Sequence, residues 1–178
     1  MLNIEDSLIV IIDIQEKLNK SVKEFSPLKN AVKIAKASSI LSVPVLVTEQ
    51  YPKGLGYTLD DLKKELTDAI YIEKNSFSAC LNQDFQNTLK HIKRKQIIIF
   101  GIETHICVYQ TICDLINLGY DVYFVKDASA SRNKMEFDIG VDLINKSGAF
   151  VTSTEIVLFE LIKTAQHPKF KEIQALIK

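Results

Sequence analysis

Short runs of apolar residues recur along the chain and alternate with longer amphipathic stretches. Residues 8–12 (LIVII) are too few for a free-standing helix and rich in β-branched side chains, which predicts a strand buried on both faces. Residues 28–42 instead place their apolar side chains on one helical face. The same reasoning predicts strands at residues 8–12, 43–48, 69–73, 96–101, 121–126 and 149–152. It predicts helices at residues 28–42, 59–66, 83–93, 104–118, 133–146 and 154–163, a loop at 50–58, and a terminal helix opened by Pro168.

The order of these elements predicts the fold class. Strands that alternate with helices at this spacing form parallel βαβ crossovers, and the helices then cover both faces of the sheet. We therefore expect an α/β protein, a three-layer α/β/α sandwich with a mostly parallel sheet of about six strands. The chain shows no internal repeat and no low-complexity linker, so we expect residues 1–178 to form a single domain.

Charge and cysteine content narrow the function classes. The chain has 22 Lys+Arg and 22 Asp+Glu, whereas a nucleic-acid-binding protein usually carries a basic excess or stripe. The one basic cluster, residues 90–95, lies at the end of a predicted helix, where cations suit the helix dipole. Three cysteines without CxxC spacing argue against a disulfide framework or zinc site and favour a reducing cytosol. We therefore expect a cytoplasmic protein with a small-molecule partner and no nucleic acid.

The first residues of the chain and the length of its apolar runs indicate whether it carries a signal peptide or a membrane span. Its first apolar run follows Asn3, Glu5 and Asp6, and a signal peptide would begin with basic residues instead. The longest apolar runs are much shorter than a bilayer span. We expect neither a signal peptide nor a membrane segment.

Three reactive side chains follow predicted strands. Ligands of open parallel sheets bind beyond the carboxyl ends of the strands, and Asp13, Lys74 and Cys107 follow the first, third and fourth. Each residue also has a plainer interpretation. Asp13 could cap a helix that starts near Gln15, Lys74 could be a solvated strand end, and Cys107 could be a packing residue.

The position of Cys107 favours a catalytic role. If Thr104 is the N-cap, Cys107 lies at N3, where the helix dipole and backbone N–H groups favour a thiolate and could receive an oxyanion. A lysine ammonium would lower the thiol pKa further, and a carboxylate could take and return the proton. Gly101 gives the turn before this helix the room that it needs. Cys113 lies within the same helix in an apolar setting, and Cys80 lies in a loop without such partners.

Five stretches in order resemble the isochorismatase-like cysteine hydrolases. They are Ile9–Gln15, Thr48–Gly56, Glu73–Ser78, Gly101–Val108 and Val125–Arg132, and together they span nearly the whole chain. The resemblance is to the subgroup that includes animal isochorismatase-domain proteins, and it implies the isochorismatase-like, Rossmann-like fold. It also implies a catalytic triad of Asp13, Lys74 and Cys107, and at least a dimer.

The resemblance carries further expectations for the site. It implies a cis peptide between Ile102 and Glu103 that aims N–H groups near Glu103 and Cys107 at the oxyanion. The implied reaction is hydrolysis of a small amide or related C–N bond through a thioester. Tyr51 and Phe77 are candidates for the pocket wall or for core or dimer contacts. Gln50 could also line the pocket, and His105 could line it or have a helix-start or surface role.

One departure from the superfamily's patterns narrows the range of activities that we expect. Nicotinamidases of this superfamily carry a metal-binding Asp-x-His pattern after the second strand, whereas residues 50–56 contain no histidine and no carboxylate. We therefore expect no catalytic zinc and no cofactor. Isochorismatases proper lack the cysteine at the nucleophile position, which Cys107 occupies here.

Two other functions compete with hydrolysis. The chain could be a binding or scaffold protein that kept the fold and lost efficient catalysis. A flavodoxin-like nucleotide binder would need a Gly-rich or Ser/Thr-rich phosphate loop after the first strand, and residues 13–17 offer neither.

Overall fold

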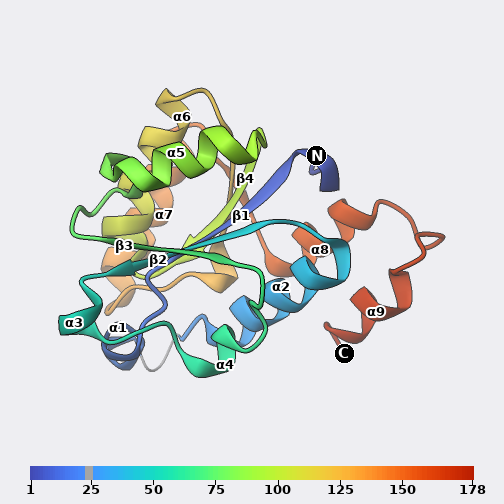
Figure 1. Cartoon of the computed structure of the whole chain (residues 1–178), viewed down its shortest axis with the longest axis horizontal. Coiled ribbons are helices and arrows are strands. Elements are labelled where there is room, and N and C mark those ends of the chain that lie inside the picture. The colour runs from blue at the N-terminus through green and yellow to red at the C-terminus, as the bar shows by residue number, and fades with distance from the viewer. Residues whose placement is uncertain (23–25) are drawn as a thin grey trace.

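A single parallel sheet forms the centre of the computed structural model, which describes residues 1–22 and 26–178 (Figure 1). Its strands are β1 (Ser7–Ile12), β2 (Val45–Gln50), β3 (Ile70–Lys74), β4 (Gln96–Gly101), β5 (Asp121–Val125) and β6 (Phe150–Thr152). They lie in the order β3-β2-β1-β4-β5-β6, and each neighbouring pair is parallel. The predicted α/β class and six-stranded sheet are confirmed.

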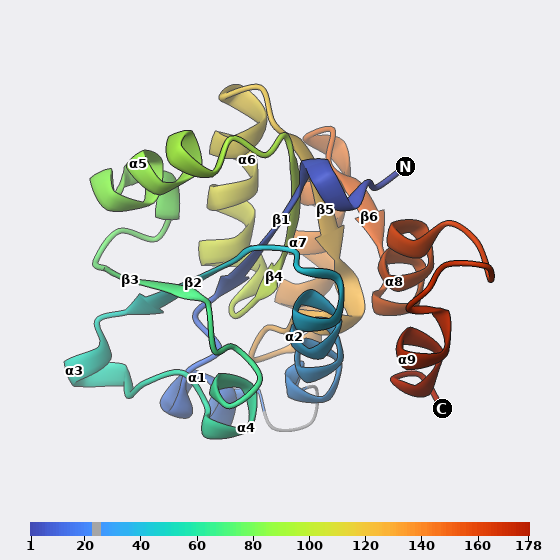
Figure 2. The same cartoon turned by 45° about the vertical axis from the view of Figure 1, so that its right-hand side comes forward.

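Helices cover both faces of the sheet (Figures 1 and 2). They are α1 (Glu16–Ser21), α2 (Leu28–Leu41), α3 (Pro52–Leu55), α4 (Asp60–Lys63), α5 (Gln83–Ile92), α6 (Tyr109–Asn117), α7 (Lys134–Lys146), α8 (Thr154–Ile162) and α9 (Phe170–Ala175). The helices α2, α4, α8 and α9 pack on one face, and α5, α6 and α7 pack on the other. Within the described residues, no helix has the length and apolar character needed to cross a bilayer.

The surroundings of β1 explain why residues 8–12 of this strand are all apolar. Ile9 and Ile11 point into the layer of α2 and α8, whereas Val10 and Ile12 point into the layer of α5, α6 and α7. All of these side chains are almost completely buried. Burying each isoleucine contributes about 1.5–3 kcal/mol, so the central strand needs apolar residues on both faces.

The second and third strands begin later than predicted. Proline has no N–H to donate, and Pro44 only accepts a hydrogen bond from Ile9 N–H, so β2 begins at Val45 instead of Val43. β2 extends to Gln50, and β3 extends to Lys74. Lys74 is therefore the last residue of a strand, where alternation fixes the face on which it lies.

Several helix boundaries also differ from the predictions. The helix α4 covers Asp60–Lys63 and not residues 59–66, and the predicted loop at 50–58 contains α3. The helix α9 begins at Phe170, two residues after Pro168. Residues 104–118 are not one regular α-helix, because Thr104–Val108 forms a π turn before α6.

Gly101 occupies a position that no other residue fits. Its φ is +143°, and a Cβ there would lie 1.9 Å from the carbonyl oxygen of Ile12. That oxygen accepts a hydrogen bond of 2.9 Å from Ile102 N–H, which holds the end of β4 against the end of β1. The glycine therefore provides the room that the sequence predicted for this turn.

We expect Gly101→Ala to destabilise the protein by about 3–5 kcal/mol, because the overlap with backbone atoms adds to the unfavourable φ. Gly148→Ala is the matched control, since Gly148 also has a positive φ (+99°) but no neighbouring atom lies within 4 Å of the position that a Cβ would take. That variant should lose only about 1–2 kcal/mol. Urea unfolding of the two variants checks this, and equal losses would contradict the steric explanation.

Candidate active site

The carboxyl ends of β1 and β4 mark the switch point of the sheet. The chain moves from β1 outward through β2 and β3, and then crosses back to place β4 on the other side of β1. Ligand sites of open α/β sheets form at such points. Asp13 follows β1, and Cys107 follows β4, so these two residues flank the switch point.

Asp13 is completely buried and directs its carboxylate toward two partners. Its Oδ2 lies 2.7 Å from Lys74 Nζ, and its Oδ1 accepts a hydrogen bond of 2.6 Å from Thr48 Oγ1. The backbone of Asp13 has φ +50°, a conformation that aspartate tolerates better than most residues. The N-cap interpretation is wrong, because Gln15 is the N-cap residue of α1.

Lys74 reaches Asp13 across the intervening strand β2. Leu46, Thr48 and Gln50 share one face of β2, and Ile72 and Lys74 share the same face of β3. Lys74 Nζ donates to Gln50 Oε1 at 2.6 Å and to the carbonyl oxygens of Ser76 and Phe77 at 3.2 and 3.3 Å. Because the Lys74 side chain is fully buried, the interpretation of this lysine as a solvated strand end is wrong.

Cys107 lies in the π turn and not at the N3 position of a regular helix. Glu103 is the residue that precedes the turn, and Thr104 is the first residue within it. The Thr104 hydroxyl donates to the Ala130 carbonyl at 3.1 Å, so it does not cap the helix as predicted. Val108 N–H donates to the Glu103 carbonyl at 3.2 Å, five residues back, which widens the first turn.

The surroundings of Cys107 favour the neutral thiol. The pKa of Cys107 is raised to about 12, mainly by burial and also by the negative charge of Asp13, whereas Lys74 lowers it. We expected the helix start to favour a thiolate and Lys74 to lower the thiol pKa. Lys74 does lower the pKa, but burial and the Asp13 charge outweigh its effect, so the expected thiolate is wrong.

Glu103 anchors the segment between β4 and the π turn. The peptide bond between Ile102 and Glu103 is cis. The Glu103 carboxylate is buried, and its Oε2 lies 3.2 Å from Arg132 Nε and 3.4 Å from His105 Nε2. The other nitrogen of His105, Nδ1, lies 2.9 Å from Ser131 Oγ. These contacts tie the start of the π turn to the segment that follows β5.

The other predicted pocket residues take different places. Gln50 touches Lys74 directly, and the Tyr51 and Phe77 side chains are exposed. A cavity of about 360 Å³ lies beside Lys74. It is lined by Tyr51, Pro52, Lys53, Glu73, Lys74, Asn75 and Asn82. From the sequence, Thr48 was known only as the start of a stretch that resembles the family, although its place two residues after Leu46 on β2 could have put it beside Asp13.

We searched the described residues for side chains that could together bind a metal ion. Among residues 1–22 and 26–178, no three histidine, cysteine, aspartate or glutamate side chains gather closely enough to hold one.

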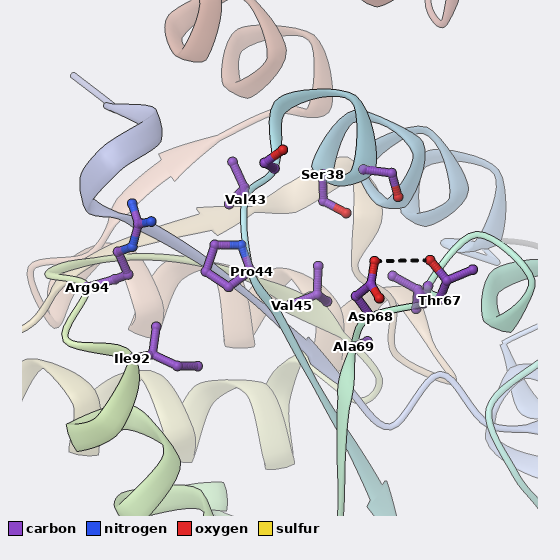
Figure 3. A pocket seen from close by; sticks show the side chains of 12 residues that line it. Ser38, Val43, Pro44, Val45, Thr67, Asp68, Ala69, Ile92 and Arg94 are labelled. Carbon is purple, nitrogen blue, oxygen red and sulfur yellow. Dashed lines mark hydrogen bonds between the residues drawn. The ribbon is translucent and has the colours of Figure 1, made fainter.

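A separate cavity lies at the opposite, amino-terminal edge of the sheet (Figure 3). It has a volume of about 460 Å³ and is lined by residues around the starts of β2 and β3, with Arg94 and Asp68 on either side of Pro44 and Val45. None of the predicted site residues lines it. The predicted site residues therefore lie apart from this cavity.

Comparison with known proteins establishes the family. The isochorismatase domain family model matches residues 7–156. This chain belongs to the isochorismatase family. Isochorismatase family protein 1A of Dictyostelium discoideum is 40% identical over 176 residues, which cover 94% of this chain and 84% of that protein. The family resemblance found in the sequence is thus confirmed, and the protein is an isochorismatase-family hydrolase.

Solved structures share the fold over almost the whole chain. The structure of MAR1 ribonuclease from Caenorhabditis elegans has a TM-score of 0.93 and 38% identity, and the match covers 99% of this chain and 91% of that one. YcaC from Pseudomonas aeruginosa, solved with hexane-2,5-diol and covalent acrylamide, has a TM-score of 0.92 and 27% identity, covering 98% and 90%.

The buried ion pair makes a prediction about stability. Lys74→Met leaves the Asp13 charge buried without its partner, so we expect a loss of about 3–5 kcal/mol. Asp13→Asn/Lys74→Met removes both charges and should recover most of that loss. Chemical denaturation of the single and double variants measures both values.

The exposed pair Asp142–Lys146 provides the control. Lys146→Met should change the free energy of unfolding by less than about 0.5 kcal/mol. A double variant at Asp13 and Lys74 whose loss equals the sum of the two single losses would contradict the coupling of the two charges.

Proposed function

We propose that this protein is a cysteine hydrolase that cleaves a small amide or related C–N bond through a thioester on Cys107. The observation that carries the proposal is the fully buried pair of Asp13 and Lys74, whose charges both act on the Cys107 thiol. A carboxylate, an ammonium and a thiol in one buried cluster provide a base, a counter-charge and a nucleophile.

The proposed reaction begins from the neutral thiol. Asp13 accepts the proton from Cys107 as the sulfur attacks the substrate carbonyl. Asp13 then gives this proton to the leaving nitrogen, so the C–N bond breaks and a thioester remains. Water, deprotonated by Asp13, hydrolyses the thioester and restores the thiol. Lys74 balances the Asp13 charge whenever the carboxylate is unprotonated.

The developing oxyanion needs backbone donors. Thr104 N–H already donates to the Ala130 carbonyl at 2.9 Å, and Ile106 N–H donates to the Glu103 carbonyl at 3.1 Å. We therefore assign the oxyanion to the N–H groups of Glu103 and Cys107, on either side of these occupied donors.

The covalent acrylamide in the Pseudomonas aeruginosa structure supports this proposal. Acrylamide is both an electrophile and a small amide. A relative with the same fold that holds it covalently fits a reactive nucleophile and a pocket of small-amide size.

Two alternatives rest on specific observations. The pKa of Cys107 is raised to about 12, the same value to which burial raises the pKa of Cys80, as expected for a scaffold protein with an inert thiol. The C. elegans relative is named a ribonuclease, which makes RNA a substrate to test. The balanced charge of this chain favours a small molecule over RNA.

Alkylation and turnover should respond to Asp13 in opposite directions. Asp13→Asn removes a negative charge that raises the Cys107 pKa, so iodoacetamide should label Cys107 about tenfold faster at pH 8. The same variant loses the proton carrier, so turnover of an amide identified by screening should fall at least about 100-fold. Peptide mass spectrometry and a substrate assay measure the two rates.

The controls separate catalysis from general opening of the protein. Cys80 is the internal control, because its labelling should not change in the Asp13 variant. Lys74→Gln should slow labelling of Cys107, since Lys74 lowers the thiol pKa. Cys107→Ala should abolish turnover, and full activity of that variant on the amide or on RNA would eliminate the proposed mechanism.

We also propose a homo-oligomer of two or more copies. The helix α7 leaves Met135, Ile139 and Leu143 exposed along one side, at a spacing of four residues. Ile139→Glu places a charge in this stripe and should shift the molar mass in light scattering toward the monomer. Glu155→Gln on α8 is the control, and an unchanged mass for Ile139→Glu would exclude this stripe from the interface.

A further inference from the structure

Thr48 makes two hydrogen bonds to Asp13, one through its backbone and one through its side chain. It lies on β2 opposite Ile12, the last residue of β1. The Thr48 carbonyl oxygen accepts from Asp13 N–H at 3.2 Å, and the Thr48 hydroxyl donates to Asp13 Oδ1 at 2.6 Å. Both residues are completely buried. Thr48 therefore holds the backbone and the carboxylate of Asp13 at the same time.

The position of Asp13 in the chain explains why this support matters. Asp13 follows the last residue of β1, so the hydrogen bonds of the sheet no longer dictate where its side chain points. Its φ of +50° lies in the left-handed region, which is unfavourable for a residue with a Cβ. The two hydrogen bonds from Thr48 stabilise this conformation.

Two donors from neighbouring strands fix the plane of the Asp13 carboxylate. Lys74 Nζ lies 2.7 Å from Oδ2, and the Thr48 hydroxyl lies 2.6 Å from Oδ1. Lys74 is held in turn by Gln50 and by two backbone carbonyl groups. Asp13 acts on the Cys107 thiol through its charge and through a hydrogen bond. Because each carboxylate oxygen has its own donor, the side of the carboxylate that faces Cys107 is fixed as well.

The two donors differ in what they can do when Asp13 is protonated. The Lys74 ammonium can only donate, whereas a threonine hydroxyl can donate or accept. Thr48 can donate to Oδ1 while that oxygen is free of a proton. It can rotate about its C–O bond and accept from Oδ1 when that oxygen carries the proton. Thr48 can therefore stay bonded to Asp13 in both protonation states of the carboxyl group.

We propose that Thr48 is a positioning residue whose hydroxyl holds the Asp13 carboxylate toward the Cys107 thiol while the proton moves between them. This role rests on the catalytic roles proposed above for Asp13 and Cys107. Thr48 acts through Asp13 and is not itself a proton carrier.

Thr48→Val and Thr48→Ser separate the effect of the hydroxyl from that of side-chain shape. Valine keeps the branched shape but donates no hydrogen bond, so the carboxylate should turn from the thiol toward Lys74. Asp13 raises the pKa of Cys107, and a weaker influence of Asp13 should therefore speed labelling by iodoacetamide. We expect Thr48→Val to label at Cys107 about threefold faster at pH 8. Thr48→Ser should label at the rate of the unaltered chain, as measured by peptide mass spectrometry.

A double variant tests whether Thr48 acts through Asp13. In Asp13→Asn the charge is already gone, so adding Thr48→Val should change the labelling rate of Cys107 by less than about twofold. General loosening of the protein would instead speed labelling in that background too, and it would also speed labelling of Cys80. This measurement needs no substrate, so failure of the hydrolase proposal does not affect it.

Turnover of an amide identified by screening gives a second readout. Thr48→Val should lower kcat about tenfold with KM within about twofold, because geometry and not binding is changed. Thr48→Ser should restore kcat to within about threefold of the unaltered chain.

Thr58→Val is the matched control. The Thr58 hydroxyl donates to Glu49 Oε1 at 2.7 Å, and both residues are buried, so the variant also removes a hydroxyl from a buried carboxylate. Glu49 alternates with Thr48 along β2 and therefore lies on the other face of the sheet. Thr58→Val should leave kcat and the labelling of Cys107 unchanged.

Four results would each overturn the proposal. They are unchanged or slower labelling of Cys107 in Thr48→Val, equal labelling rates in the valine and serine variants, an equally large increase in the Asp13→Asn background, and an equal fall in kcat in Thr48→Val and Thr58→Val. Full turnover by Cys107→Ala would instead remove the hydrolase mechanism and leave the labelling of the Thr48 variants as it is. The two failures are therefore distinguishable.

Discussion

The buried contact between Asp13 and Lys74 constrains the rest of the candidate active site. Two opposite charges lie 2.7 Å apart with no exposed surface, and such a pair is stable only when its remaining donors and acceptors are satisfied. Thr48 and Gln50 meet that need from β2, the strand between the two charges. The parallel registers of β1 with β2 and of β2 with β3 must therefore be held closely for the pair to form.

The two members of this pair act in opposite directions on Cys107, the proposed nucleophile. Asp13 raises the thiol pKa of Cys107 and Lys74 lowers it, while burial favours the neutral thiol. In the proposed reaction the proton moves from Cys107 to Asp13 only as sulfur attacks. A thiol held neutral at rest is protected from solvent electrophiles and oxidants, because the thiolate is the reactive form. The thiol of Cys107 then reacts only when a bound substrate allows Asp13 to accept its proton.

Local sequence patterns predicted the sheet and the placement of the reactive groups. The apolar runs at residues 8–12 and 96–101 are central strands, because buried parallel strands leave no polar face. Asp13 and Lys74 meet because the carboxyl ends of parallel strands share one edge. These inferences needed only the pattern along the chain and the geometry of parallel sheets.

Contacts between segments that are distant in the sequence determine the features that the sequence did not predict. Thr104 fails as an N-cap because its hydroxyl donates to Ala130, which is 26 residues away. The thiol pKa depends on how deeply Cys107 is buried, and no local motif reports this. A cavity beyond the carboxyl ends of β5 and β6 is lined by residues from Ser26 to Ser153, so it exists only in the folded chain.

Rapid-quench mass spectrometry of the protein during turnover of an amide tests the central claim most directly. The account predicts an acyl group on the peptide that contains Cys107, appearing before free acid and absent from Asp13→Asn. Turnover at the same rate in Cys107→Ala, or an acyl group carried by Cys80 or Cys113 instead, would contradict it.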